Sequence, residues 1–322
     1  MKLNQFFRKA VDLGIAADPR GKEQIQKQFK KEKERRKKLE GIDLELFDEE
    51  RTWNPFGDSR IINGTGDEEF TSIAVGIDIE TPELLLIDHL RKNGQRIDGA
   101  LIHHPEGRAL ADLPLIMPML VEMLAESGLP VNQTEGMLRP RIDRVRRSIH
   151  SDNLLRVGRA AELLQVPAVC CHTITDNLVY RYMEKKICSQ KFDELGDIVK
   201  ALLEVPEYKY YAVRGMPPFI VSGGKSSRPG RIRPNEFTGG TNGPEEFFEA
   251  QARAGVGTIL TMHMNDKSLE EAKKHHINVI QVCHMAADTL GMNLLLDHIE
   301  KMEPKLKVFE LSGFVRMKRR KL

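Results

Sequence analysis

Hydrophobic and polar residues alternate along the chain in segments whose lengths and periods predict an α/β protein. Short apolar runs predict β-strands at residues 71–79, 98–102, 166–171, 256–262, 277–283 and 307–311. Apolar residues at helical spacing predict helices at residues 81–94, 113–128, 154–165, 244–255, 268–276 and 286–302. Strands that alternate with helices of this length indicate βαβ units and a largely parallel sheet. The strand–helix cycle occurs twice, which indicates an internal duplication.

The segments outside this pattern suggest how the chain is divided. About the first 45 residues predict two helices, and residues 50–69 and 222–243 are rich in turn-forming residues and predict loops. We therefore expect an N-terminal helical extension at residues 1–50. A first α/β repeat is expected at residues 51–190 and a second at residues 191–322.

Composition excludes several classes of protein. The 322 residues are 40% hydrophobic, which is enough for a sizeable core, and the net charge of +2 creates no field that would select nucleic acid or membrane. No apolar run approaches the roughly 18 residues needed to cross a bilayer. Four cysteines are too few for a disulfide framework in a chain of this length, so we expect a cytoplasmic protein. Residues 20–40 carry a local excess of positive charge, which favours a solvated helix over a nucleic-acid arm.

Histidine is the residue type whose placement points to chemistry. Five of the ten histidines follow predicted strands, and ligand sites of open α/β sheets gather beyond the carboxyl ends of strands. These five residues are His103, His104, His172, His263 and His284.

Two adjacent pairs of histidines are predicted to differ in role. His275 and His276 end a predicted helix, where imidazolium suits the negative end of the helix dipole, so we expect a surface role. His103 and His104 leave a strand, where alternation turns their rings in opposite directions, and Pro105 ends that strand. Rings that diverge in this way can each serve a different ion of a two-metal site.

Two carboxylates strengthen the metal hypothesis. Asp176 follows His172 by four residues, and Asp288 follows His284 by four residues. Residues i and i+4 share a helix face, so His284 and Asp288 can bind an ion jointly if the turn after the strand is helical. Imidazoles together with a bridging carboxylate are usual in sites that hold two metal ions.

Two other interpretations of these segments stay open. Cys171 and Cys283 precede candidate ligands, which would allow a single zinc ion bound with thiolate help, although buried strand cysteines are the favoured interpretation. The sequence GGTNGPEE at residues 239–246 opens a predicted helix. It can hold an anion on free backbone N–H groups, and helix capping explains it equally well.

Four motifs together resemble one protein family. GIDIETPE at residues 76–83, LIHHPEG at 101–107, HTITD at 172–176 and CHMAAD at 283–288 are similar, in this order, to motifs of the NIF-three-like family of GTP cyclohydrolase type 2 homologs. The resemblance covers roughly residues 52–322. It implies two intertwined α/β repeats with mixed, largely parallel sheets and a dinuclear metal site between them. It also implies a homo-oligomer, since many members form toroidal hexamers.

The resemblance also implies a set of metal ligands. Carried over by motif, they are His103, His104, Asp176, His284 and Asp288. This chain departs from the family at Asp288, where Glu is usual. It departs again at residues 261–263, where TMH replaces the family's TGE, so that His263 either replaces an acidic neighbour or adds a ligand.

These observations predict a metal-dependent hydrolase with two divalent metal ions. Zinc or iron suits the imidazoles and manganese suits the carboxylates. The family's label implies a small, nucleotide-like substrate. The alternative is a non-catalytic metal-binding or regulatory scaffold protein built on the same site.

Overall fold

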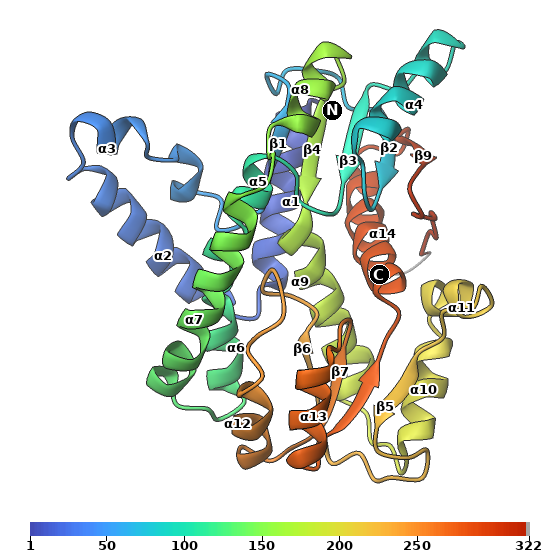
Figure 1. Cartoon of the computed structure of the whole chain (residues 1–322). Coiled ribbons are helices and arrows are strands. Elements are labelled where there is room, and N and C mark those ends of the chain that lie inside the picture. Colours follow the sequence, from blue (N-terminus) through green and yellow to red (C-terminus); the bar gives the residue numbers. More distant parts are fainter. Residues whose placement is uncertain (320–322) are drawn as a thin grey trace.

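Two mixed β-sheets organise the chain in the computed structural model, which describes residues 1–319 (Figure 1). The first sheet has the order β1 (Ser59–Asn63), β4 (Ala168–Cys171), β3 (Gly99–Ile102), β2 (Ser72–Gly76) and β9 (Lys307–Glu310). The second sheet has the order β5 (Phe219–Ser222), β8 (Asn278–Gln281), β7 (Val256–Thr261) and β6 (Arg231–Glu236). The predicted α/β class with mixed, largely parallel sheets is confirmed.

The two sheets share one topology. In each, three parallel strands occur in sequence order, namely β2, β3 and β4 in the first sheet and β6, β7 and β8 in the second. In each, an earlier strand adds to the third of these in antiparallel orientation, β1 beside β4 and β5 beside β8. Strand β9 then returns to the first sheet and pairs in parallel with β2. The division of the chain into repeats at residue 190 stays a prediction, and the last three residues of the expected second repeat lie outside the described part.

Fourteen α-helices connect and cover the sheets in the described part of the chain. They are α1 (Leu3–Ala17), α2 (Gly21–Arg36), α3 (Gly41–Glu45), α4 (Thr81–Lys92), α5 (Arg108–Ala111), α6 (Met119–Glu126), α7 (Val131–His150), α8 (Arg156–Leu163), α9 (His172–Met183), α10 (Leu195–Leu203), α11 (Pro206–Ala212), α12 (Phe247–Arg253), α13 (Asp266–Lys274) and α14 (His284–Met302). None of the helices within residues 1–319 is both long enough and apolar enough to cross a membrane.

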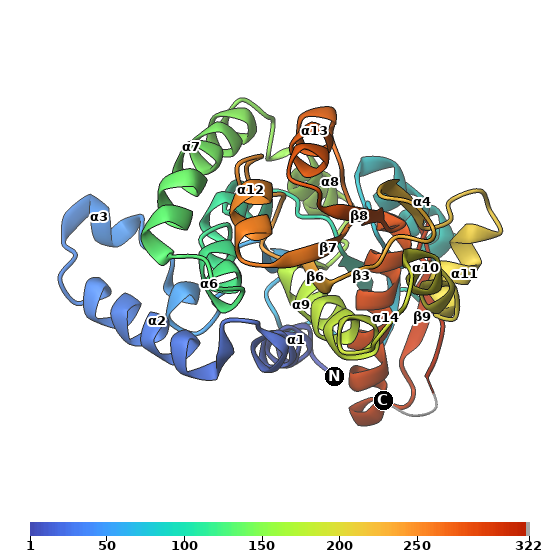
Figure 2. The same ribbon diagram turned by 90° about the horizontal axis from the view of Figure 1, so that it is seen from below.

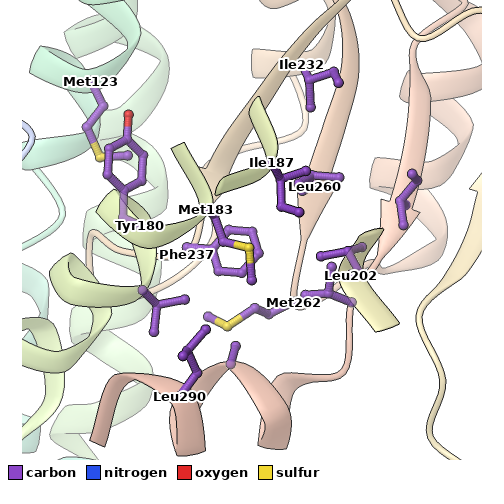
Figure 3. Close-up of a cluster of buried hydrophobic side chains, with 14 of the residues drawn as sticks. Met123, Tyr180, Met183, Ile187, Leu202, Ile232, Phe237, Leu260, Met262 and Leu290 are labelled. Carbon is purple, nitrogen blue, oxygen red and sulfur yellow. The ribbon is translucent and has the colours of Figure 1, made fainter. Parts of the chain in front are cut away.

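Helices α9 and α14 each leave one sheet and pack against the other. Helix α9 begins directly after β4, yet its residue Tyr180 belongs to a buried cluster with Leu260 of β7 in the second sheet (Figure 3). Helix α14 begins after β8, yet its residue Leu295 belongs to a buried cluster with Val75 of β2 in the first sheet. The two helices therefore join the two sheets at the centre of the molecule.

The N-terminal helices differ in how much of their surface is buried in the core. Helix α1 is amphipathic and buries Leu3, Phe6 and Phe7 in the same cluster as β2, so it is part of the body of the protein. Helix α2 buries only Ile25, Phe29 and Glu32, and Figures 1 and 2 show α2 and α3 extending away from the sheets. The expected solvated helix at residues 20–40 therefore corresponds to α2.

Two predicted loops contain strands. Strand β1 lies within residues 50–69, and β6 lies within residues 222–243. Both are edge strands with polar sequences, SRIIN and RIRPNE, so the apolar run that marks a buried strand is missing. The loop prediction was wrong at these two segments, and β1 brings a residue of the functional site with it.

Candidate metal centre

The predicted ligands meet where strands of both sheets end. His103 and His104 follow β3 directly, and the first residues of α9 and α14 are His172 and His284. Asp176 and Asp288 lie one helical turn farther along α9 and α14, so each shares a helix face with the histidine that begins its helix. The structure thus brings all five predicted ligands together, and it adds His172.

Asp288 lies between three imidazole rings. Its Oδ1 atom is 3.4 Å from His103 Nε2, and its Oδ2 atom is 3.5 Å from His104 Nε2 and 3.2 Å from His284 Nε2. Two carboxylate oxygens therefore face different histidines, which is the arrangement that a bridging carboxylate requires.

Asp176 forms a second group on the other side of His103. Its Oδ1 atom is 3.7 Å from His103 Nε2, and its Oδ2 atom is 3.7 Å from His172 Nε2. Ligand atoms of His103, His172 and Asp176 lie within 4.8 Å of one another, as do those of His103, His104 and Asp288. Each of these two groups can hold a metal ion.

Hydrogen bonds at the Nδ1 atoms turn three rings into the cluster. Asp78 accepts from His104 Nδ1 at 2.6 Å, and Asp58 accepts from His172 Nδ1 at 2.8 Å. The hydroxyl of Thr175 is bonded to backbone carbonyls, so its oxygen accepts from His103 Nδ1 at 2.9 Å. Metal-binding histidines are commonly held in this way by outer carboxylates or oxygens, which leave the Nε2 lone pair free for the ion.

His263 performs the same role for the fourth ring. Its Nδ1 is 3.2 Å from Asn242 Oδ1, and its Nε2 is 3.1 Å from His284 Nδ1. Because the Asn242 amide nitrogen donates to the His263 carbonyl, its oxygen accepts from Nδ1, and His263 Nε2 is left to accept from His284. His263 therefore orients a candidate ligand, and its own Nε2 points away from Asp288.

Three buried atoms at the centre of the cluster have no hydrogen-bond partner among the described residues. They are His103 Nε2 and both carboxylate oxygens of Asp288, and the side chains of these residues are 0% and 1% exposed. The approaches of 3.2 to 3.5 Å around Asp288 are long for hydrogen bonds between charged groups. A buried polar atom without a partner costs about 1–3 kcal/mol, and more when charged. The residues therefore fit metal ions, which together would supply a partner to each of the three atoms.

Burial and mutual attraction set the protonation of the metal-free cluster. Burial lowers the pKa of both His103 and His284 to about 4, so these rings are neutral with free lone pairs. Burial also opposes protonation of His104, but Asp288 and Asp78 outweigh it and raise the pKa of His104 to about 10. Burial raises the pKa of Asp176 to about 7. Although burial favours its neutral form, the pKa of Asp288 lies well below its usual range because of the surrounding histidines.

The cysteines do not take part in the cluster. Cys171 lies in the buried core beneath the first sheet, and burial raises the pKa of its thiol. Burial also raises the pKa of Cys283, which is half-buried. No group of potential metal ligands within residues 1–319 includes a cysteine. The interpretation of these cysteines as packing residues is therefore favoured over zinc binding by thiolates.

A cleft of about 240 Å³ opens onto the cluster. Residues near the ends of strands of both sheets line it, including five histidines and Asp176. The lining residues are His103, His104, Pro105, Leu110, Leu113, His172, Asp176, Glu236, Thr238, Gly240, Thr241, Asn242, Met262, His263 and His284. Burial raises the pKa of Glu236 to about 7, which makes this carboxyl a group that can hold or release a proton near neutral pH.

Sequence reasoning missed the residues that support the cluster. Asp58 lies in a stretch predicted to be a loop, and Thr175 and Glu236 carry no sequence signal of their own. Asp78 was detectable, because it is the acidic residue near the end of the predicted strand at residues 71–79, within the GIDIETPE motif. The other adjacent pair of histidines, His275 and His276, follows the C-terminal end of α13 and lines no part of the cleft, as expected.

The fold and the cluster together define an α/β protein with histidines and aspartates that can hold metal ions between two sheets. No protein-family model matches the sequence, and no curated protein matches it. Among solved structures, the chain is similar to a NIF3 superfamily protein from Sphaerobacter thermophilus. The sequence identity is 26%, the TM-score is 0.69, and the match covers 80% of this chain and 92% of that chain. This similarity supports the resemblance to the NIF-three-like family that the sequence motifs indicate.

Two further solved structures match the chain at lower similarity. Reduced HcgD from Methanocaldococcus jannaschii has 10% identity and a TM-score of 0.49, with 79% of this chain and 88% of that chain covered. TTHA1606 from Thermus thermophilus has 12% identity and a TM-score of 0.46, with 80% and 90% covered. At this level of similarity, neither protein indicates a function for this chain.

Proposed function

We propose that this protein binds two divalent metal ions and acts as a metal-dependent hydrolase on a small substrate. The observation that carries the proposal is the position of Asp288, whose two buried oxygens face different histidines. Each oxygen lacks a hydrogen-bond partner within the described chain, and each would gain one ligand bond from an ion.

The ligands would divide into two groups around Asp288. One ion would be held by His103, His172, Asp176 and the Oδ1 atom of Asp288. The other would be held by His104, His284 and the Oδ2 atom of Asp288. His172 is thereby added to the ligands implied by the family resemblance. The mixture of imidazoles and carboxylates suits zinc, iron or manganese.

A pair of divalent ions supplies Lewis acidity and lowers the pKa of a water molecule toward neutrality. The protein's own residues would orient the ligands and transfer protons. Asp58, Asp78 and Thr175 hold the rings in position from outside the cluster. Glu236 faces the cleft with a pKa of about 7, so it can accept or donate a proton during turnover.

One observation favours the alternative, a non-catalytic metal-binding or regulatory scaffold. The cleft volume of about 240 Å³ is below the range of about 300–1,000 Å³ that is usual for small-molecule sites. A hydrolase would have to bind only part of its substrate there or widen the cleft when substrate binds.

Elemental analysis and a substrate panel together test the proposal. Protein purified without chelator is expected to contain about two ions per chain. The loaded protein is expected to hydrolyse at least one member of a panel of nucleotides and phosphoesters, and chelation is expected to abolish that turnover. Two ions without turnover would favour the scaffold, whereas one ion or fewer after addition of Zn²⁺, Fe²⁺ or Mn²⁺ would contradict the dinuclear site.

The family likeness also leads us to expect a homo-oligomer, with a hexamer as the form that the resemblance implies, and the low cysteine content leads us to expect a cytoplasmic location. Light scattering of the purified protein measures the oligomeric state directly.

A further inference from the structure

The loop between β6 and α12 lines the same cleft as the candidate metal cluster. Its sequence FTGGTNG includes Gly239 and Gly240, whose φ angles of +99° and +81° are rarely adopted by other residues. A side chain at Gly239 would also collide with Leu120, since a Cβ atom there would lie 2.6 Å from Leu120 Cδ2. The paired glycines are therefore required by the path of the loop.

Three consecutive backbone N–H groups of this loop remain free within the described chain. The N–H groups of Gly240, Thr241 and Asn242 donate to no protein acceptor, and all three residues line the cleft. Helix α12 begins only at Phe247, whose own N–H donates to the Pro244 carbonyl. Helix capping therefore does not account for the free amides.

Side chains on three sides hold the loop in place. The Thr238 hydroxyl donates to Asn177 of α9 at 2.7 Å, and Arg141 of α7 donates to the Asn242 carbonyl at 3.2 Å. Asn242 also bonds to His263, which in turn orients the candidate ligand His284. The free amides are thus fixed relative to the metal cluster, and binding a ligand would require little ordering of the loop.

Direct bonds to the ions, rather than net charge, would favour an anion in the loaded site. Two divalent ions carry four positive charges, which Asp176 and Asp288 together with the outer carboxylates Asp58 and Asp78 balance. The cleft also contains the carboxyl of Glu236, which accepts a hydrogen bond from the Thr261 hydroxyl and is partly protonated near neutral pH. An anionic ligand in this cleft could bind the ions and the N–H groups of residues 240–242, which line the same cleft.

We propose that the cleft binds a phosphoryl group between the metal cluster and the N–H groups of residues 240–242. The inference rests on the proposed function, because it requires the two ions. A planar carboxylate presents both oxygens in one direction, whereas the diverging oxygens of a phosphoryl group can reach the ions and the loop together. The volume of about 240 Å³ holds such a head group, and the remainder of a phosphate ester would lie along Leu110 and Leu113.

Calorimetry on the full-length, metal-loaded protein tests this assignment, with metal content measured on every sample. Inorganic phosphate and phenyl phosphate are the two probes, and tighter binding of phenyl phosphate would identify an ester rather than free phosphate as the ligand. Thr241→Pro removes one of the three N–H groups and the hydroxyl, and Thr241→Val removes the hydroxyl alone. Lys225→Pro is the control, because it lies in the turn Gly224–Ser227 of another glycine-rich loop that does not line the cleft.

Thr241→Pro is expected to weaken the binding of both probes at least about tenfold while keeping both ions. Lys225→Pro is expected to leave the affinity unchanged. Equal affinity in Thr241→Pro and wild type, with metal content intact, would overturn the loop site and leave the proposed function standing. Absence of metal from the wild type would overturn both.

Hydrogen exchange gives a second measurement that needs no variant. Phosphate is expected to slow exchange of the amides in the peptide that contains residues 240–242 in the loaded wild type. Unchanged exchange at saturating phosphate would overturn the inference even if Thr241→Pro fails to fold.

Discussion

Gly291 of α14 lies against the backbone of Thr175 in α9. A Cβ atom at position 291 would stand 2.7 Å from the Thr175 carbonyl oxygen, closer than such atoms approach in folded proteins. Glycine at this position therefore lets the two helices touch directly beside Asp176 and about one helical turn from Asp288. The spacing between the two candidate metal groups depends on this contact.

Gly291→Ala is expected to destabilise the protein by about 1–3 kcal/mol, because the new methyl group must push α9 away from α14. It is also expected to reduce metal content, since the displacement separates Asp176 from Asp288. Gly136→Ala in α7 is the matched control. A Cβ atom there meets nothing within 4 Å, so this change should stabilise the helix by up to about 1 kcal/mol. Thermal denaturation and elemental analysis of both variants provide the measurements, and equal stability of the two would refute the argument.

His104→Ala and His276→Ala are expected to behave differently. The first removes a ring whose Nε2 faces Asp288, so metal content should fall. The second removes an exposed ring at the end of α13, so metal content should be unchanged and stability should change by less than about 1 kcal/mol. Elemental analysis distinguishes the two variants. Loss of metal from both, or from neither, would contradict the role assigned to the ends of the strands.

Asp288→Asn is expected to lose both ions, because the amide keeps the shape but offers a single neutral oxygen where two anionic oxygens are needed. Asp288→Glu keeps the charge and adds one methylene in a fully buried position, so a smaller loss is expected. Asp297→Asn, on the same helix, breaks an ion pair with Arg316 and should cost stability without loss of metal. Retention of both ions at wild-type affinity by Asp288→Asn would show that Asp288 lies outside the ligand set.

Metal binding is expected to release protons at neutral pH. His104 has a pKa of about 10 and Asp176 a pKa of about 7 in the metal-free protein, and each must lose its proton to bind an ion. Affinity should therefore rise between pH 6 and pH 8. Titration calorimetry in two buffers of different ionisation enthalpy measures the protons released. Affinity that falls over this pH range would contradict these protonation states.

The metal-free protein is expected to lose stability as the pH rises from 7 to 10. The folded pKa of His104 lies above its unfolded value of about 6.5, so its contribution is complete below pH 6.5 and is lost as the pH approaches 10. The pKa of Asp176 is likewise raised, from 3.8 to about 7, so its contribution is lost at lower pH, between about 4 and 7, and does not add to the change above pH 7. Urea denaturation at several pH values tests this, and loading with metal should remove most of the dependence. Constant stability of the metal-free protein would show that the cluster does not control it.

The sequence predicted those parts of the fold in which burial requires a pattern of apolar residues. The central strands β2, β3, β4, β7 and β8 are apolar because both faces are covered, and each was predicted. The edge strands β1 and β6 were missed because each contains charged and polar residues, so no apolar run marks it. Their structure depends on backbone pairing with β4 and β7, and no local sequence pattern predicts that pairing.

The sequence likewise predicted the candidate ligands at the centre of the site better than the residues that hold those ligands in position. His284 and Asp288 share a helix face at a spacing of four residues, which is visible in the sequence and recurs in the structure. Asp58 reaches His172 from a position more than a hundred residues earlier, and that contact depends on the pairing of β1 with β4. Contacts of this kind arise from topology, which periodicity alone does not encode.

The crossing of α9 and α14 also determines when the site can form during synthesis. His103, His104, His172 and Asp176 leave the ribosome well before His284 and Asp288, and their helix α9 packs against a sheet that is still being translated. An unfinished chain would therefore expose four candidate ligands and an unpaired apolar helix. We therefore expect stable metal binding only after translation is complete and β9 has paired with β2. Metal ions that bind the unfinished chain earlier would interfere with its correct folding.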